Sequence, residues 1–306
     1  MHALLTLAGP TASGKTAAAI ALAQALDGEV VCADSVQVYR GFDIGSAKPS
    51  VEERRGVPHH LLDVLDAHQT LDAVRWARMA DDAIASVMAR GRLPIVAGGT
   101  PLWLRALLRG LVEAPAADAE LRARLEAEAG RNGLAALHER LRQLDPPSAA
   151  RIHPHDRVRI VRALEITLRT GRPASVLRAA HALGARRHPG LLVVLEPERD
   201  AHERAIEVRV DAMLRAGLLE ETRALLARHG ASVRPLRAVG YAEMVMHLND
   251  GLPLEQARAR MLRRTRRYAR QQRLWWRNEP GVDLRTTLEA LLSPEGLDRV
   301  RAALGR

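Results

Sequence analysis

Residues 9–16 have the types and spacing of a loop that binds phosphate. They read GPTASGKT, which fits the pattern G-x-x-x-x-G-K-[ST]. In this pattern the glycines let successive backbone N–H groups point at phosphate oxygens, the lysine adds a charge, and the last hydroxyl can ligate Mg²⁺. The predicted phosphate ligands are Gly9, Pro10, Thr11, Ala12, Ser13, Gly14, Lys15 and Thr16, with Thr16 also the metal ligand. Taken alone, the loop suggests ATP but does not say whose phosphate it binds.

The segments on either side of this loop are those that a phosphate site requires. Residues 4–8 form an apolar run that suits a buried parallel strand, and residues 17–26 favour a helix. Two more buried strands are indicated at 29–33 and 94–97, and a short one at 59–65. Because helices alternate with these strands, we expect an α/β fold, a P-loop NTPase-like parallel sheet flanked by helices.

Other polar residues follow strands of the predicted sheet. Asp34 comes directly after the second strand, and Thr100 ends a Gly-Gly-Thr sequence after another. Because the carboxyl ends of parallel strands share one edge of a sheet, we expect both residues beside the phosphate loop. Asp34 could then ligate Mg²⁺ or act as a general base, and Thr100 could hydrogen-bond a phosphate or the nucleophile. Arg209 could clamp a leaving group's charge, although a solvated, salt-bridged arginine is the commoner use.

The sequence changes in character after residue 113. Residues 114–118 resemble a linker, and from 119 to about 183 the chain reads as helices, one at 118–129, one at 133–144 and one from about 155 to 171. A strand signal then returns at 191–195. We therefore predict a P-loop core domain with C-terminal helices (residues 1–113 and 186–306) and a helical insertion domain (residues 114–185).

The charge of the chain is strongly positive and comes almost entirely from arginine. The net charge is +10, and Lys15 and Lys48 are the only lysines, which suggests that both positions need a compact ammonium. Nine arginines lie within residues 258–277, while Met261, Thr265, Tyr268, Gln272 and Trp275 run down a roughly opposite helical face. Such a helix could grip nucleic-acid phosphates, so nucleic acid is a plausible partner.

Composition also excludes several classes of protein. Cys32 is the only cysteine, so neither an intrachain disulfide nor a cysteine-based metal site can form, which fits a reducing compartment. The apolar runs are shorter than the roughly 18–20 residues that a membrane span needs. The first strand follows the N-terminus too closely for a signal peptide. We expect a cytoplasmic protein, monomeric and without a membrane partner.

Seven stretches together resemble one family, the bacterial tRNA dimethylallyltransferases, also called tRNA isopentenyltransferases or IPP transferases. They are residues 9–16, 34–49 (DSVQVYRGFDIGSAKP), 59–63 (HHLLD), 94–108 (PIVAGGTPLWLRALL), 145–165 (ending in RIHPHDRVRIVRALE), 237–243 (RAVGYAE) and 265–277 (TRRYARQQRLWWR). They occur in the family's order and are spread over most of the chain. The combination is specific, whereas the phosphate loop alone is not.

The resemblance implies a reaction. The family transfers a dimethylallyl group from dimethylallyl diphosphate to the N6 amine of the adenosine immediately 3′ of the anticodon, in tRNAs that read codons beginning with U, and releases diphosphate. By resemblance, the phosphate loop holds the diphosphate with Mg²⁺. Asp34 acts as general base on the adenine amine or orients it, Thr100 stands near the point of attack, and Arg209 holds the pyrophosphate. The insertion domain would grip the anticodon stem, and the target base would be flipped into the pocket.

The resemblance also implies contacts with tRNA along much of the chain. They are Asp34, Ser35, Val36, Gln37, Thr100, Arg122, Val158, Arg159, Ile160, Val161, Arg162, Arg237, Ala238, Val239, Gly240, Tyr241, Ala242, Arg270, Gln271, Gln272, Arg273, Leu274, Trp275, Trp276 and Arg277. Some positions depart from the family pattern. Pro101 and Trp103 stand where Gly and Tyr are common, Ser46 replaces a usual Thr, and Ala205 and Gln271 each replace a usual Arg.

Two other functions fit parts of the sequence. The first is a small-molecule P-loop kinase with a helical lid, which the arginine- and aromatic-rich helix and residues 153–165 disfavour. The second is a non-catalytic RNA-binding or ATP-driven remodelling protein, which the expected grouping of Asp34 and Thr100 at the phosphate loop disfavours.

Overall fold

A six-stranded sheet lies at the centre of the larger part of the molecule. The computed structural model describes residues 4–111, 115, 117–180 and 186–305. The strands are β1 (Leu4–Ala8), β2 (Gly28–Cys32), β3 (His59–His60), β4 (Leu93–Ala97), β5 (Gly190–Leu195) and β6 (Leu284–Thr286). Their order is β3-β2-β4-β1-β5-β6, and every neighbouring pair is parallel. This confirms the predicted fold class, although β6 was not foreseen.

The central strands β1 and β4 are buried because their residues are almost all apolar on both faces. All five residues of β1 and of β4 are buried, as is typical of parallel strands covered from both sides. The register places Leu5 of β1 between Ile95 and Leu191 of its two neighbours. The short strand predicted at 59–65 ends already at His60, because Leu61 and then Asp63 take positive φ angles of 61° and 55° and turn the chain away from β2.

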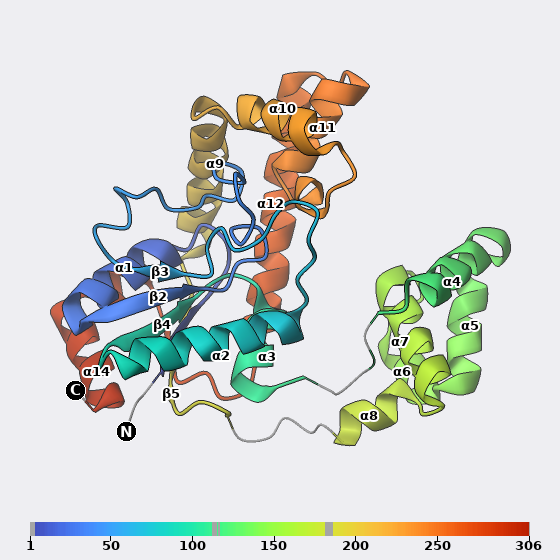
Figure 1. The fold of residues 1–306 in the computed structure, drawn as a ribbon, viewed down its shortest axis with the longest axis horizontal. Helices are drawn as coiled ribbons and strands as arrows, with labels where there is room; N and C mark the ends of the chain where they lie inside the picture. The colour runs from blue at the N-terminus through green and yellow to red at the C-terminus, as the bar shows by residue number, and fades with distance from the viewer. Residues whose placement is uncertain (1–3, 112–114, 116, 181–185, 306) are drawn as a thin grey trace. The chain divides into compact units, whose positions relative to one another are not determined.

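Helices cover the sheet and extend beyond it (Figure 1). They are α1 (Lys15–Leu26), α2 (Ala73–Ala89), α3 (Pro101–Arg109), α9 (Arg199–Arg215), α10 (Leu218–His229), α11 (Tyr241–Asp250), α12 (Leu254–Arg277), α13 (Leu288–Leu292) and α14 (Pro294–Leu304), with a 3₁₀ turn η1 (Arg234–Arg237). Helices α1, α13 and α14 share one hydrophobic cluster with β1, β4 and β5, and α2 packs on β2 and β4. Helices α9 to α12 pack on one another. The two short helices after β6 were not foreseen.

A separate compact unit is formed by residues Arg109–Ala185. Its helices are α4 (Ala119–Asn132), α5 (Leu134–Leu144), α6 (Pro146–Arg151), α7 (Arg157–Thr170) and α8 (Ala174–Ala180). They enclose a core of their own that includes Leu137, Leu141 and Leu164. The three predicted helices of this segment are present, whereas the short α6 and α8 were not foreseen. The predicted boundaries at 113–114 and at 185 fall on residues outside the described part of the chain.

The sheet places several loops at one edge. Residues 9–16 follow β1, Asp34 follows β2, and residues 98–100 follow β4, so all three extend from the carboxyl ends of parallel strands. Among the described helices, none is both long and apolar enough to cross a membrane.

Candidate active site

The loop of residues 9–16 takes a backbone path that its glycines make possible. Gly9 and Gly14 have φ angles of 148° and 84°. A Cβ on Gly9 would lie 2.8 Å from the carbonyl oxygen of Leu195, and one on Gly14 would lie 2.6 Å from the Leu288 side chain. Both glycines of the motif are therefore favoured by backbone conformation, and at Gly9 the nearby Leu195 carbonyl also leaves no room for a side chain.

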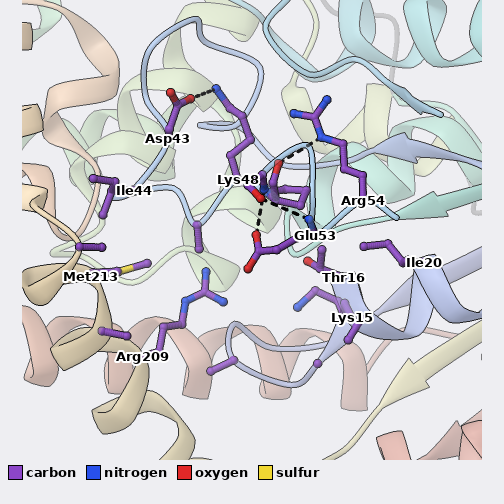
Figure 2. Close-up of a pocket in the computed structure, with 18 of the residues that line it drawn as sticks. Lys15, Thr16, Ile20, Asp43, Ile44, Lys48, Glu53, Arg54, Arg209 and Met213 are labelled. Carbon is purple, nitrogen blue, oxygen red and sulfur yellow. Dashed lines mark hydrogen bonds and ion pairs between the residues drawn. The ribbon is translucent and has the colours of Figure 1, made fainter. Parts of the chain in front are cut away.

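Two cations face a cleft beside this loop. The cleft has a volume of about 1020 Å³ and is lined by residues 12–16 together with Arg209 and the loop near Lys48. Figure 2 shows Lys15 and Arg209 reaching into it from opposite sides. Lys15 Nζ donates to the Pro10 carbonyl at 2.5 Å and lies 3.5 Å from Ser13 Oγ. In the described part of the chain, no carboxylate forms an ion pair with Lys15 or Arg209.

The electrostatics of the cleft favour an anion. Desolvation lowers the pKa of Lys15 to about 7; the nearby Arg209 adds to this effect and Asp34 opposes it. Desolvation also lowers the pKa of Arg209, again against the influence of Asp34. A polyanion bound between the two cations would add negative charge to that of Asp34 and offset the desolvation of Lys15 and Arg209.

Thr16 offers the hydroxyl that a P-loop metal needs. It lies in the first turn of α1, is exposed, and lines the same cleft. Over the residues that can be described, no group of three or more His, Cys, Asp or Glu could hold a metal ion. Mg²⁺ often binds through few protein groups plus substrate phosphates. The donor set therefore fits a Mg²⁺ ion that enters together with a diphosphate.

Asp34 and Thr100 lie together, as the sheet topology predicts. Asp34 Oδ1 accepts hydrogen bonds from the backbone N–H groups of Val36 (2.8 Å) and Gln37 (3.3 Å). Thr100 Oγ1 accepts one from the N–H of Ser35 at 3.2 Å. The second oxygen of Asp34, Oδ2, has no hydrogen-bond partner among the described residues. One oxygen thus fixes the carboxylate while the other remains available to a substrate.

A second cavity, of about 300 Å³, adjoins Asp34. Thr11, Asp34 and Arg237 are among the residues that line it. Arg209 and Met213 of α9 line both this cavity and the phosphate cleft, so the two spaces meet at α9. Thr100 lines neither of them. A molecule with a charged end in the cleft could therefore extend past Arg209 toward Asp34.

Helix α12 forms a wall of the second cavity. Met261, Arg264, Thr265 and Tyr268 line it, and the Tyr268 hydroxyl donates to the Gly99 carbonyl at 3.3 Å. Tyr268 and Arg264, like Met213, were not among the predicted site residues. The signal that could have identified Tyr268 is its place on the helical face that carries Met261 and Thr265 and few arginines.

The predicted tRNA contacts differ widely in exposure. Exposed are Val158, Arg159, Arg237, Arg270, Gln271, Leu274 and Arg277. Partly exposed are Asp34, Ser35, Val36, Thr100, Arg122, Arg162, Ala238, Val239, Ala242, Arg273 and Trp275. Buried are Gln37, Ile160, Val161, Gly240, Tyr241, Gln272 and Trp276. The buried residues contact other parts of the protein. They could therefore contribute to RNA binding only by positioning neighbouring residues that are exposed.

In the helical unit, two of these arginines share one carboxylate. Arg122 donates to Glu165 through Nε (3.0 Å) and Nη2 (2.9 Å), and Arg162 donates through Nη1 (2.6 Å). Burial alone would raise the pKa of Glu165, which is fully enclosed, but the two arginines outweigh it and hold the pKa below its usual value. One buried carboxylate thus orients two arginines and leaves an excess of positive charge.

Two of the departures from the family pattern have a local explanation. Trp103 stacks on Trp76 with ring centroids 5.1 Å apart, so this aromatic ring belongs to the core. Pro101 occupies the first position of α3, where a proline has no N–H to leave unpaired. Nothing in the structure explains Ala205, and Arg209 on the same helix has no neighbouring arginine at that position.

Comparisons with known proteins match nearly the whole chain. The family model for IPP transferase matches residues 37–279. A tRNA dimethylallyltransferase of Anaeromyxobacter sp. (strain Fw109-5) is 56% identical over 283 residues, which cover 92% of this chain and 94% of that protein. The crystal structure of the full-length tRNA isopentenylpyrophosphate transferase from Bacillus halodurans has a TM-score of 0.73 at 34% identity and covers 100% of this chain and 97% of its own. A eukaryotic dimethylallyltransferase acting on tRNA has a TM-score of 0.77 at 28% identity and covers 90% of this chain and 70% of its own.

The sequence matches and the site geometry lead to one assignment. The family model covers well over half of the chain, and the match to the relative from Anaeromyxobacter covers 94% of that protein. The phosphate loop and Asp34 lie in adjoining cavities of the same domain. The chain belongs to the IPP transferase family, the tRNA dimethylallyltransferases.

Proposed function

We propose that this chain transfers the dimethylallyl group of dimethylallyl diphosphate to the N6 amine of the adenosine immediately 3′ of the anticodon in tRNAs that read codons beginning with U. Diphosphate is the second product. The observation that carries the proposal is that Arg209 lines both the phosphate cleft and the cavity of Asp34. A donor that is charged at one end and apolar at the other fits this pair of spaces.

Departure of the diphosphate needs the strongest electrostatic support. When the allylic carbon–oxygen bond breaks, its electron pair goes to the diphosphate, and Lys15, Arg209 and the loop N–H groups stabilise the new charge. Mg²⁺, held by the Thr16 hydroxyl and the diphosphate itself, would neutralise part of that charge. The apolar side chains of Met213 and Met261 at the second cavity keep water from the allylic carbon while it is cationic.

Asp34 acts at the acceptor. The lone pair of N6 forms the new bond to the allylic carbon, and the nitrogen then gives up one proton. Oδ2 of Asp34 takes this proton, because Oδ1 is held by the turn that follows. Tyr268, which lines the same cavity, offers an aromatic face on which the flipped adenine stacks.

The arginine-rich surfaces hold the RNA. Exposed arginines of α7 and α12, among them Arg159, Arg270 and Arg277, bind backbone phosphates, and the helical insertion domain grips the anticodon stem. We further propose that the enzyme is a monomer and that it acts in the cytoplasm, where its tRNA substrate is found.

Transfer of labelled donor to tRNA tests the proposal directly. The protein is incubated with Mg²⁺, labelled dimethylallyl diphosphate and unmodified tRNA, and the label is located by nuclease digestion. Label on the adenosine 3′ of the anticodon is expected. No label in tRNA, together with phosphate transfer from ATP to a metabolite, would favour the kinase alternative.

Asp34→Asn isolates the general base. Asparagine keeps the oxygen that accepts the turn's hydrogen bonds and removes the proton acceptor, so tRNA binding is retained while kcat falls by about 10²- to 10⁴-fold. Binding is measured by filter retention and kcat with saturating donor. Full activity of the variant would remove Asp34 from the mechanism.

A further inference from the structure

Thr11 of the phosphate loop is held by two buried side chains from helices outside the loop. Its backbone N–H donates to Oε1 of Gln272 at 2.8 Å, and its carbonyl oxygen accepts from Nε2 of His202 at 2.7 Å. Gln272 is 2% exposed and His202 is 3% exposed. Both backbone hydrogen-bonding groups of this one loop residue are therefore engaged by α12 and α9.

The amide of Gln272 reaches a second part of the site. Its Nε2 donates to the carbonyl oxygen of Gly99, the residue before Thr100. Because the Thr11 N–H can only donate and the Gly99 carbonyl can only accept, the amide has one possible orientation. A Cβ on Gly99 would lie 2.8 Å from this nitrogen, so glycine at that position lets the amide approach. Gln272 thus joins the loop after β1 to the loop after β4.

The other partner, His202, is fixed in one tautomer. Its Nδ1 lies 2.8 Å from Nη2 of Arg273, a group that can only donate, and the same nitrogen of Arg273 donates to the Pro197 carbonyl at 3.0 Å. Nδ1 must therefore be the acceptor, so Nε2 carries the hydrogen and donates the hydrogen bond to the Thr11 carbonyl. Only the neutral imidazole can make both hydrogen bonds. Desolvation lowers the pKa of His202, with Arg273 and Lys15 adding to this, which favours the neutral form.

We propose that Gln272 and His202 are positioning residues of the transfer reaction, which hold Thr11 and thereby fix the phosphate loop in the shape that receives the diphosphate. Together with Arg273 they form the Thr11 clamp. This inference rests on the proposed function, since it takes a diphosphate as the ligand of the loop. A neutral amide and a neutral imidazole hold the loop without placing a carboxylate that would compete with diphosphate for Lys15 and Arg209.

Adjacent glutamines on α12 provide a matched pair of variants. Gln271 is exposed, whereas Gln272 is buried in the clamp. Methionine at either position keeps the length and the helix propensity of glutamine and removes its hydrogen bonds. Gln272→Met deletes the support of Thr11 and Gly99, and Gln271→Met makes the same chemical change on the solvent side.

The pair is compared by titration calorimetry with Mg²⁺ and inorganic pyrophosphate in the absence of RNA, and by steady-state kinetics. We expect Gln272→Met to lower kcat/KM for dimethylallyl diphosphate by about 100-fold, the size of effect that a misplacement of roughly 1 Å produces. Its pyrophosphate affinity, measured without RNA, falls as well. Gln271→Met is expected to keep the wild-type affinity for pyrophosphate.

Variants of His202 test the other half of the clamp. His202→Leu removes the donor to Thr11, whereas His202→Gln keeps an N–H that can replace it. We expect the leucine variant to resemble Gln272→Met and the glutamine variant to recover most of the pyrophosphate affinity. Because both supports act on Thr11, the double variant Gln272→Met/His202→Leu should lose less than the product of the two single effects.

The outcomes separate the clamp from the function on which it rests. Wild-type pyrophosphate affinity in folded Gln272→Met and His202→Leu would overturn the clamp. A wild-type protein that binds neither pyrophosphate nor dimethylallyl diphosphate would overturn the proposed function instead. If Gln272→Met does not fold, as judged by circular dichroism, the two His202 variants decide. Equal losses of pyrophosphate affinity in His202→Leu and His202→Gln would overturn the clamp. Recovery of that affinity in His202→Gln would support it.

Discussion

The two lysines of this chain lie in two loops at the same edge of the sheet and are used in opposite ways. The side chain of Lys48 is 4% exposed, and its ammonium donates to the Tyr39 carbonyl at 2.9 Å and to the carboxylates of Asp43 and Asp63, both at 2.5 Å. Lys15 has only a carbonyl and a hydroxyl as hydrogen-bond partners in the described structure. A positive charge that the fold itself neutralises stabilises a loop, whereas one left without a carboxylate is available to a ligand.

The side chains that hold the two loops in place also differ in charge. In the Lys48 loop, the carboxylate of Glu221 accepts hydrogen bonds from the successive N–H groups of residues 43–45 and from the Tyr241 hydroxyl at 2.6 Å. The phosphate loop is held by the neutral side chains of Gln272 and His202. The charged support neutralises positive charge in one loop, whereas the neutral supports leave the positive potential of the other available to an anion.

Of the two lysine substitutions, Lys15→Met should have the larger effect on activity. We expect kcat/KM for dimethylallyl diphosphate to fall about 10³-fold, because one preorganised charge on the leaving group is lost. Steady-state kinetics at fixed tRNA concentration measure it, with Lys48→Met as the matched control. A larger catalytic loss in Lys48→Met than in Lys15→Met, at equal fractions of folded protein, would show that Lys48 and not Lys15 is the lysine that serves the ligand.

Lys48→Met should act on stability. The free energy of unfolding should fall by about 2 kcal/mol, because two carboxylates and a carbonyl lose their shared donor. Lys48→Arg should also destabilise the protein, since a planar guanidinium cannot fill the place of a compact ammonium in so enclosed a site. Urea unfolding curves measure the stability of both variants. Wild-type midpoints for both would show that the Lys48 contacts contribute nothing to the free energy of unfolding.

The sequence could place Lys15, Asp34 and Thr100 because their positions depend on local pattern and on a general rule of parallel sheets. A phosphate-loop motif after a strand defines Lys15, and residues that follow neighbouring strands must meet at one edge. The same reasoning anticipated the order of strand and helix along most of the chain. It extended the third strand too far, because no apolar pattern shows the positive φ of Leu61.

The partners of Thr11 could not be predicted in this way. The contact between Thr11 and Gln272 joins residues 261 positions apart and depends on how α12 packs against the edge of the sheet. Helical spacing separates Gln272, which lies on the face of Met261 and Tyr268, from Gln271, although the resemblance predicted that both contact tRNA. What this face of α12 packs against, the backbone of Thr11 and of Gly99, depends on the tertiary packing of α12 and not on any local pattern.

A smaller effect on stability is expected from Glu221→Gln. Glutamine keeps one acceptor oxygen and loses the charge, so the free energy of unfolding should fall by about 1–2 kcal/mol. Tyr241→Phe, which removes only the hydrogen bond of the hydroxyl, is the matched control and should lower the free energy of unfolding by less. Urea unfolding measures both. A Glu221→Gln protein as stable as wild type would mean that the loop needs no charged support.

The smallest expected effect is a pH dependence of stability that comes from His202. Because desolvation lowers its pKa below the usual 6.5, the unfolded chain binds more protons than the native protein between the two values. The free energy of unfolding should therefore be fully retained above pH 6.5 and decline as the pH falls through the native pKa. Around the imidazole, the hydrogen bond to the Thr11 carbonyl and the charge of Glu203 favour protonation, whereas desolvation, Arg273 and Lys15 oppose it and outweigh them.

His202→Gln should flatten this part of the pH profile, because the substituted amide does not titrate. Urea unfolding at intervals between pH 5 and pH 8 measures both proteins under the same salt. Identical profiles would show that the native protein accepts a proton on His202 without cost. The imidazole would then not need to be neutral to support Thr11, and the phosphate loop would lose the feature that distinguishes its supports from the charged ones of the Lys48 loop.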